Sequence, residues 1–389
     1  MSTIAPIAPS QFNKNNPFLA TVTENRLLGK SGSIKDTRHL VVNIKGSGWQ
    51  YQPGWSLGVF PKNPPVLVDD LVARLGLDAD ARLAQKDGST KALRRVLSED
   101  LTLNRASKKF VRAVAEKLPA GARKDGLLTV SGSEEALGEY VYSRDYIDVL
   151  NEFPEVKFTA EELVGNLSRV NPRLYSIASS QAKHPDEVHL IVAVVRYSSH
   201  GRDKKGLCSG FLADDTTLNV ANLPVFLTQN KHFSLPADHD APVIMVGPGT
   251  GIAPFRAFLE EREVRGARGR NWLFFGDQHR ATDFVYEDEF AAWQRGGLLT
   301  KLSTAFSRDQ AHKIYVQDRM REEGAELWQW LKAGAYFYVC GDAKRMAKDV
   351  HQALIDIAAR HGGLSPSAAD EYVNKTLMKD ERRYVRDVY

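Results

Sequence analysis

The sequence predicts an antiparallel β-barrel with a helical insertion, followed by an α/β domain built on a parallel sheet. Short β-branched runs separated by glycine turns open the chain, and helical apolar spacing then fills residues 64–167. After residue 237, apolar strand-like runs alternate with helical patterns. This alternation indicates a parallel sheet with right-handed crossovers, because parallel neighbours cannot be joined by a tight hairpin.

The composition is that of a globular protein with room for two or three domains. Of the 389 residues, 43% are hydrophobic and 26% are charged, and the formal net charge is +4. This excess of positive charge is too small to predict nucleic-acid binding. It suits an anionic small ligand or an acidic protein partner.

The two cysteines, Cys208 and Cys340, form no CxxC motif, so we expect neither a disulfide framework nor a structural zinc site. The histidines lack paired ligand spacing, and no bound metal is expected. The N-terminus shows no secretion signal, and no apolar run approaches the roughly 18 residues that span a bilayer. We therefore expect a cytoplasmic protein with no membrane partner.

Changes of periodicity divide the chain into parts. FLATVTENRLL, HLVVNI and YQPGWSLGVFPKN have strand patterning, and RLYSIASS and EVHLIVAVVRY return to it after helical stretches such as DDLVARLGLDADARLA and SKKFVRAVAEKL. In the last part, APVIMVG, NWLFFG, LLTKLSTAF and AYFYVCG are buried strands. The predicted organisation is a disordered segment 1–16, a barrel from 17–63 and 168–236, a helical insertion 64–167 and an α/β domain 237–389.

The stretch GPGTGIAPFR leads from the first α/β strand through a glycine turn into a helix. Glycines let the backbone approach a ligand, and the helix N-terminus offers free N–H groups, so Gly249, Thr250 and Gly251 suit a pyrophosphate. The spacing is not the usual GxGxxG, and the alternative is an ordinary turn.

Further along, SRDQAHKIYVQ places Ser307, Arg308 and Lys313 at the carboxyl end of a predicted strand. A hydroxyl and two cations there suit the ribose 2′-phosphate of NADPH, whereas sites for NAD carry an acid. The alternative is a solvated basic loop.

Three other stretches carry residue types typical of a flavin site. In RLYSIASS, Arg173 suits a pyrophosphate, Tyr175 suits stacking on the isoalloxazine and Ser176 suits the flavin N5. KKGLCSGFL is a turn into a helix, which is an anion-binding geometry. Cys340 follows a predicted strand in VCGDAKRM. The alternatives are an exposed barrel strand and a cysteine that packs as a small core side chain.

Taken together, RLYSIASS, GLCSGFLAD, GPGTGIAPFRAF, SRDQAHKIYVQDRM, YVCGDAKRMAKDV and ERRYVRDVY resemble one family in order and spacing. The chain resembles the FAD- and NADPH-binding module of diflavin reductases, in the ferredoxin–NADP reductase superfamily, and within it the flavoprotein alpha components of NADPH–sulfite reductases. The helical block resembles their connecting domain. The resemblance runs from Pro17 to Tyr389.

The resemblance implies site residues by position. It implies that Ser176, Cys340 and Asp387 are catalytic residues that surround the point where the nicotinamide meets the flavin. Implied FAD contacts are Arg173, Leu174, Tyr175, Ser176, Ile191, Val192, Ala193, Tyr197, Gly206, Leu207, Cys208, Ser209 and Tyr389. Implied NADPH contacts are Gly249, Thr250, Gly251, Ser307, Arg308, Lys313, Tyr315, Gln317 and Asp349. Tyr389 would stack on the flavin where the nicotinamide must go, and the alternative is a packing residue of a docked C-terminal strand.

The resemblance also implies an activity: hydride passes from NADPH to FAD, and electrons leave singly for an FMN or flavodoxin-type carrier, for sulfite reduction. Diflavin proteins begin with a flavodoxin-like FMN domain, and no such segment precedes Asn15 here. We expect that carrier, or a sirohaem sulfite reductase hemoprotein, as the partner. A second departure is Cys208, where the sulfite reductase flavoproteins tend to have a small residue. At this position the sequence resembles the ferredoxin reductases. The alternatives are a stand-alone ferredoxin or flavodoxin reductase and a non-catalytic FAD-binding docking module.

Overall fold

The computed structural model of the protein describes residues 11–389. Within this range the chain folds into two compact units. Unit 1 contains residues up to Gly58, Leu174–Ala193 and Leu218–Tyr389, and unit 2 contains Val59–Arg173 and Val194–Thr217. The predicted domain boundaries remain a prediction. Residues 1–10 of the segment predicted to be disordered lie outside the described residues, and Asn13 and Asn16 form a backbone bridge in the rest of it.

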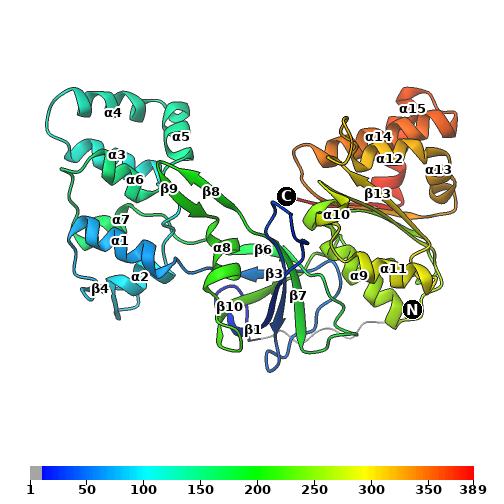
Figure 1. Ribbon diagram of the computed structural model, residues 1–389, viewed down its shortest axis with the longest axis horizontal. Helices are drawn as coiled ribbons and strands as arrows, with labels where there is room; N and C mark the ends of the chain where they lie inside the picture. The colour runs from blue at the N-terminus through cyan, green and yellow to red at the C-terminus, as the bar shows by residue number, and fades with distance from the viewer. Residues whose placement is uncertain (1–10) are drawn as a thin grey trace. The chain divides into compact units, whose positions relative to one another are not determined.

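A six-stranded sheet gathers strands from both sides of the helical insertion, as the blue and green arrows of Figure 1 show. Its order is β6-β3-β10-β1-β2-β7, and β1 pairs antiparallel with both β10 and β2. An antiparallel bridge between Ile177 and Leu190 links the β6 end to β7, which closes the sheet into a barrel. The strands are β1 (Phe18–Leu27), β2 (Thr37–Asn43), β3 (Ser56–Val59), β6 (Arg173–Ser176), β7 (Glu187–Ala193) and β10 (Ala221–Thr228).

Unit 2 is mainly helical and has its own core, in which Phe110 stacks on Phe158 and meets Tyr146 edge-on. Two of its helices begin with capping boxes, at Asp145 and Thr159. The helices are α1 (Pro65–Leu75), α2 (Leu93–Glu99), α3 (Lys108–Lys117), α4 (Ala122–Gly132), α5 (Glu134–Tyr142), α6 (Tyr146–Glu152), α7 (Ala160–Asn166) and α8 (Leu207–Gly210), the last running into a π-helical turn at Phe211–Asp215.

Two expectations for this part of the chain were wrong in detail. DDLVARLGLDADARLA is not one helix, because Gly76 adopts φ +65° and ends α1, and the chain then forms a hairpin of β4 (Arg82–Ala84) and β5 (Thr90–Ala92). EVHLIVAVVRY is not one strand. It leaves the barrel after Ala193, and Arg196–Ser199 (β8) pairs instead with Arg202–Lys205 (β9) in unit 2.

The second half of unit 1 is a parallel sheet with order β13-β12-β11-β14-β15. Alternate side chains of β11 enter two cores: Val243 and Met245 pack with α9 and α11, and Ile244 and Val246 pack with α12, α13 and α14. The fifth strand, β15, was not among the four predicted. The strands are β11 (Val243–Val246), β12 (Asn271–Asp277), β13 (Lys301–Phe306), β14 (Tyr336–Gly341) and β15 (Tyr384–Val388).

The helices of this half connect successive strands. They are α9 (Ala253–Val264), α10 (Arg280–Asp283), α11 (Glu287–Arg295), α12 (Val316–Glu322), α13 (Gly324–Lys332), α14 (Met346–Gly362) and α15 (Pro366–Glu371), which continues into a π-helix at Tyr372–Asp380. β11 lies between β12 and β14, so the connections diverge there and leave a topological switch point at the carboxyl ends of these strands. None of the described helices is both long and apolar enough to cross a membrane.

Candidate active site

The glycine turn after β11 lies at the switch point and approaches the next strand closely. Gly249 adopts φ +57°, and Gly249–Ile252 form one 3-10 turn before α9 begins. A Cβ atom on Gly251 would lie 2.2 Å from the carbonyl oxygen of Cys340, so only glycine fits there. The turn therefore brings the backbone of the predicted NADPH residues Gly249, Thr250 and Gly251 against the strand that carries Cys340.

The three residues predicted to carry hydride transfer come together in unit 1. Parallel pairing of β14 and β15 sets Cys340 opposite Asp387. Ser176, the last residue of β6, donates its hydroxyl hydrogen bond to Asp387 Oδ2 over 3.2 Å. A fourth residue that the sequence did not single out, Asn230, donates from Nδ2 to Asp387 Oδ1 over 3.4 Å. Asn230 lies in a loop without a motif, so only the structure finds it.

The surroundings of Asp387 disfavour negative charge. Burial raises the pKa of the Asp387 carboxyl, and the Ser176 hydrogen bond opposes this only partly. Cys340 is fully buried, and burial together with the nearby Asp387 charge raises the pKa of its thiol well above the ordinary value. The cluster thus offers a neutral thiol and a carboxylate held by neutral donors, which can respond to a positive charge that develops beside it.

Tyr389 follows directly on β15 and is attached to the same turn. Its N–H donates to the Gly341 carbonyl over 3.1 Å, and its carbonyl accepts from the Ala343 N–H over 3.0 Å. Its hydroxyl lies 3.2 Å from the hydroxyl of Thr250. The side chain is 55% exposed, so its ring is available to a ligand above the switch point.

The other predicted FAD residues of unit 1 differ in what they offer. Leu174 is 49% exposed and Tyr175 is half-buried, so both present side-chain surface. Ile191 and Val192 are buried in the barrel, which leaves a ligand only their backbone. Ala193, at the end of β7, is exposed.

The remaining FAD residues belong to unit 2. Arg173 is exposed, and Tyr197 on β8 is 40% exposed. Gly206 precedes α8, and a Cβ atom there would lie 2.8 Å from Ser209 Oγ, which accepts from the Val195 N–H. Tyr197 and Leu207 line a cavity of about 860 Å³ within unit 2. The glycine at this tight turn and the cavity beside it fit a dinucleotide. Cys208 Sγ lies 3.9 Å from the Val59 carbonyl oxygen.

The predicted 2′-phosphate residues lie on a loop fixed to the end of β12. The Ser307 N–H donates to the Asp277 carbonyl over 2.9 Å, and the Arg308 N–H donates to the Gln278 carbonyl over 2.9 Å. The side chains of Arg308 and Lys313 are exposed and form no ion pair with any residue from 11 to 389. Two cations without carboxylate partners on an ordered loop suit a phosphate dianion.

Three further predicted NADPH contacts are Tyr315, Gln317 and Asp349. Tyr315 caps the start of α12 and is 44% exposed. Gln317 donates from Nε2 to Asp349 Oδ2 at 3.5 Å, which joins α12 to the first turn of α14. These three residues therefore come from two neighbouring helix N-termini.

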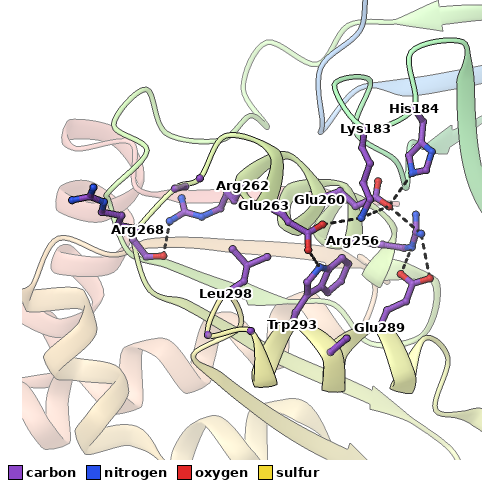
Figure 2. Close-up of a pocket in the computed structure, with 16 residues that line it drawn as sticks. Lys183, His184, Arg256, Glu260, Arg262, Glu263, Arg268, Glu289, Trp293 and Leu298 are labelled. Atoms are coloured by element: carbon purple, nitrogen blue, oxygen red, sulfur yellow. Dashed lines mark hydrogen bonds and ion pairs between the residues drawn. The ribbon is translucent and has the colours of Figure 1, made fainter.

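A separate pocket of about 690 Å³ in unit 1 contains none of the predicted residues. In Figure 2 the side chains of Lys183, Arg256, Glu260, Glu263 and Glu289 point toward one another. Arg256 pairs with Glu289 at 2.8 Å and with Glu260 at 3.1 Å, and Lys183 pairs with Glu263 at 2.8 Å. Since each of these carboxylates already has a cation, the pocket has the character of a structural network.

Beside this pocket, His184, Glu187 and His189 place ligand-type atoms within 4.8 Å of one another, a grouping that the spacing of the histidines did not predict. Arg256 Nη1 lies 3.4 Å from His189 Nδ1, so that nitrogen is the acceptor and the proton resides on Nε2, facing Glu187 at 3.2 Å. A metal would need that same Nε2 atom. We therefore assign the group to hydrogen bonding.

Comparison with known proteins shows the family of the chain. The model of the FAD binding domain family matches residues 10–211. The chain belongs to this family. The model of the oxidoreductase NAD-binding domain matches residues 245–352. Together the two family matches confirm the predicted fold class and the predicted cofactors, FAD and NADPH.

Curated relatives narrow the family. The chain is 45% identical, over 98% of its length, to a sulfite reductase [NADPH] flavoprotein alpha-component of Yersinia pestis and to that of Pectobacterium atrosepticum. It is 42% identical, over 99% of its length, to that of Bacillus subtilis. These alignments cover 61% to 64% of the relatives, so the chain spans about three fifths of their length. The predicted resemblance to flavoprotein oxidoreductases of this kind is confirmed.

Proposed function

We propose that the chain takes a hydride from NADPH onto FAD and passes electrons singly to an FMN or flavodoxin-type carrier, in the service of sulfite reduction. The observation that carries the proposal is the meeting of Ser176, Cys340 and Asp387 at the switch point. The names of the relatives support electron transfer from NADPH toward sulfite, since these proteins are sulfite reductase [NADPH] flavoprotein alpha-components.

In this proposal the bound cofactors supply the redox chemistry, and the protein binds and orients them. Ser176 holds a hydroxyl at the flavin edge without bulk, and Cys340 leaves room beside it because its side chain is small. Asp387 stabilises positive charge on the donor ring as the hydride leaves. Tyr389 shields the reactive face and moves aside for the nicotinamide, and its hydroxyl contact with Thr250 gives it a resting position.

Each predicted contact set has a share in binding. The proposed FAD contacts are Arg173, Leu174, Tyr175, Ile191, Val192, Ala193, Tyr197 and Gly206–Ser209. The Gly249–Gly251 turn takes the NADPH pyrophosphate, and Ser307 and Arg308 take its 2′-phosphate. Lys313, Tyr315 and Gln317 line the adenosine side, and Asp349 lies at the rim of the nucleotide site. The proposed partner is an FMN domain or a flavodoxin-like protein, or a sirohaem hemoprotein, and the proposed location is the cytoplasm.

Two other functions make different predictions. A docking module that binds FAD without turnover would leave the visible flavin absorption unchanged when NADPH is added, whereas the proposed enzyme bleaches it. A stand-alone ferredoxin or flavodoxin reductase would reduce those carriers and support no sulfite reduction with a sulfite reductase hemoprotein. The helical unit 2 favours the diflavin type.

The nucleotide half is tested by Arg308→Ala. Losing the charge-assisted contact should raise KM for NADPH about tenfold or more, because one such contact is worth at least that factor. KM for NADH and kcat should stay near the wild-type values, since NADH lacks the 2′-phosphate. Steady-state kinetics with both nucleotides measure this. Equal changes for NADPH and NADH would show that Arg308 does not read the phosphate.

A further inference from the structure

The loop between β1 and β2 of the barrel reaches across unit 1 to the end of β12. Lys35 Nζ lies 2.6 Å from Asp277 Oδ1 and 2.9 Å from Asp277 Oδ2. The lysine side chain is 30% exposed, but that of Asp277 is only 6% exposed. Lys35 therefore neutralises a carboxylate that water hardly reaches, and such a pair is costly to break from one side.

Asp277 in turn holds the loop that carries Ser307 and Arg308. Its backbone carbonyl accepts from the Ser307 N–H over 2.9 Å and from the Ser307 hydroxyl over 3.3 Å. Its Oδ1 atom accepts from the Gln278 N–H over 2.7 Å, and the Gln278 carbonyl accepts from the Arg308 N–H. Asp277 is thus hydrogen-bonded directly to Ser307 and, through Gln278, to Arg308.

A second connection runs in parallel from the same barrel loop. Ser33 donates its hydroxyl to Asp283 Oδ1 over 2.5 Å, and Asp283 Oδ2 accepts from the His279 N–H. His279 Nδ1 lies 3.0 Å from Asp309 Oδ1, next to Arg308. Two independent routes of hydrogen bonds therefore lead from residues 33–35 to residues 307–309.

The other end of the barrel loop leads into β2, which pairs with β7, a strand that carries proposed FAD contacts. Thr37, two residues after Lys35, pairs with Ala193 in the register of β2 and β7. Ala193 is one of the residues assigned to FAD. The loop therefore lies between a strand that lines the flavin and the loop that receives the 2′-phosphate.

We propose that Lys35 is a positioning residue for recognition of the 2′-phosphate, acting through Asp277 on Ser307 and Arg308. Both oxygens of Asp277 engage Lys35 Nζ, so Lys35 acts on the loop and not on the ligand directly. Without Lys35, a buried carboxylate would lose its cation beside a site for a dianion, and the loop would lose its anchor. This inference rests on the proposed function, which places the 2′-phosphate at Ser307 and Arg308.

Ligand binding to the FAD-loaded protein tests this apart from turnover. Isothermal titration calorimetry would compare adenosine 2′,5′-bisphosphate with adenosine 5′-monophosphate, two probes that differ only by the 2′-phosphate. Lys35→Met should weaken the bisphosphate about tenfold, the factor expected when one charge-assisted contact is misplaced. It should leave the monophosphate near wild type. Lys35→Arg should restore the affinity, because it keeps the cation.

Lys30→Met is the matched control. Lys30 lies on the same barrel loop and pairs with Glu287 at 2.9 Å, but Glu287 keeps a second cation, Arg280 at 2.7 Å, when Lys30 is lost. The control should bind both probes like the wild type. Equal weakening of both probes by Lys35→Met, or weakening of neither, would overturn the positioning role. If Arg308→Ala also leaves the bisphosphate affinity unchanged, then the assignment of the 2′-phosphate site itself fails, and the two failures are thereby told apart.

Discussion

Two carboxylates in unit 1, the half-buried Asp387 and the buried Glu260, are in opposite electrostatic situations. Asp387 has two neutral hydrogen-bond donors, Ser176 and Asn230, and no ion pair among residues 11–389. Glu260 is only 1% exposed, yet it meets Arg256 at 3.1 Å and His184 at 3.2 Å. Burial raises the pKa of Asp387, whereas the partners of Glu260 outweigh its burial and lower its pKa.

The difference distinguishes the proposed reacting group, Asp387, from a structural group, Glu260. A carboxylate with full cation pairing contributes to the fold, and breaking the pair is costly. A carboxylate whose burial is left uncompensated stores electrostatic free energy that is released when positive charge appears beside it. Pocket size does not make this distinction, since the pocket of Figure 2 belongs to the paired network.

The largest effect should come from breaking the paired network with Arg256→Met. Arg256 also donates to the Ala178 carbonyl over 2.7 Å, so the change removes the arginine cation from Glu260 and the donor from this carbonyl. The free energy of unfolding should fall by about 3–4 kcal/mol, the range seen when one member of a buried pair is removed. Chemical denaturation measures this.

Lys375→Met is its control, because Lys375 and Glu371 form an exposed pair with 62% of each side chain accessible. That change should alter stability by less than about 0.5 kcal/mol. A similar loss in both variants would show that pairing at Glu260 has no special weight.

In contrast to Arg256→Met, Asp387→Asn should have a large effect on the rate of hydride transfer and little effect on stability. Hydride transfer should slow about 100-fold, as when one preorganised transition-state group is removed. The FAD content and the free energy of unfolding should stay near the wild-type values, since an amide loses less solvation free energy than a carboxylate at a site shielded from water. Stopped-flow flavin reduction and denaturation measure the two. Reduction at the wild-type rate would refute the role of Asp387.

The pH profile sharpens this comparison. Because the pKa of Asp387 is raised, the carboxylate gains its proton earlier than an ordinary aspartate as the pH falls. The wild-type rate should therefore decline on acidification above the usual titration range of aspartate. That step should be missing in Asp387→Asn.

The smallest effect concerns the histidines of the paired network. Burial, with Arg256 adding to it, lowers the pKa of His189 to about 4. A lowered histidine pKa means that the unfolded chain binds the proton first, so stability is complete above the unfolded pKa and is lost as the pH falls. Between pH 6.5 and 5 the loss should be about 1.5 kcal/mol. His189→Gln should flatten this part of the stability profile, and an unchanged slope would contradict the assignment.

Much of the fold could be predicted from the sequence because its signals are local. Continuous apolar runs such as APVIMVG identify buried parallel strands, and the glycine turn after it identifies a nucleotide site. A C-terminal strand was considered only as the alternative, because YVRDV is short and its two charged residues, Arg386 and Asp387, are adjacent and interrupt the alternation typical of a strand. The hairpin at residues 82–92 was missed because its apolar residues also fit helical spacing.

The candidate site could be predicted only where motifs mark it. Ser176, Cys340 and Asp387 lie in recognisable stretches, and the structure brings them together. Asn230 and the pair of Lys35 with Asp277 lie in stretches without a motif, and Lys35 and Asp277 are 242 positions apart. Such contacts depend on how the barrel and the parallel sheet pack, which periodicity does not reveal.

The pairing of β15 has a consequence for how insertions and deletions would act. Side chains alternate between faces along a strand, so a shift of one position would replace the acid opposite Cys340 with Val388 or Arg386. The Arg383 carbonyl accepts from the Phe337 N–H at one end, and the Tyr389 N–H donates to Gly341 at the other. These two hydrogen bonds hold β15 in its pairing register with β14. Adding or removing a single residue between Asp380 and Arg383 would thus leave the composition almost intact while exchanging an anion for a cation or an isopropyl group opposite Cys340.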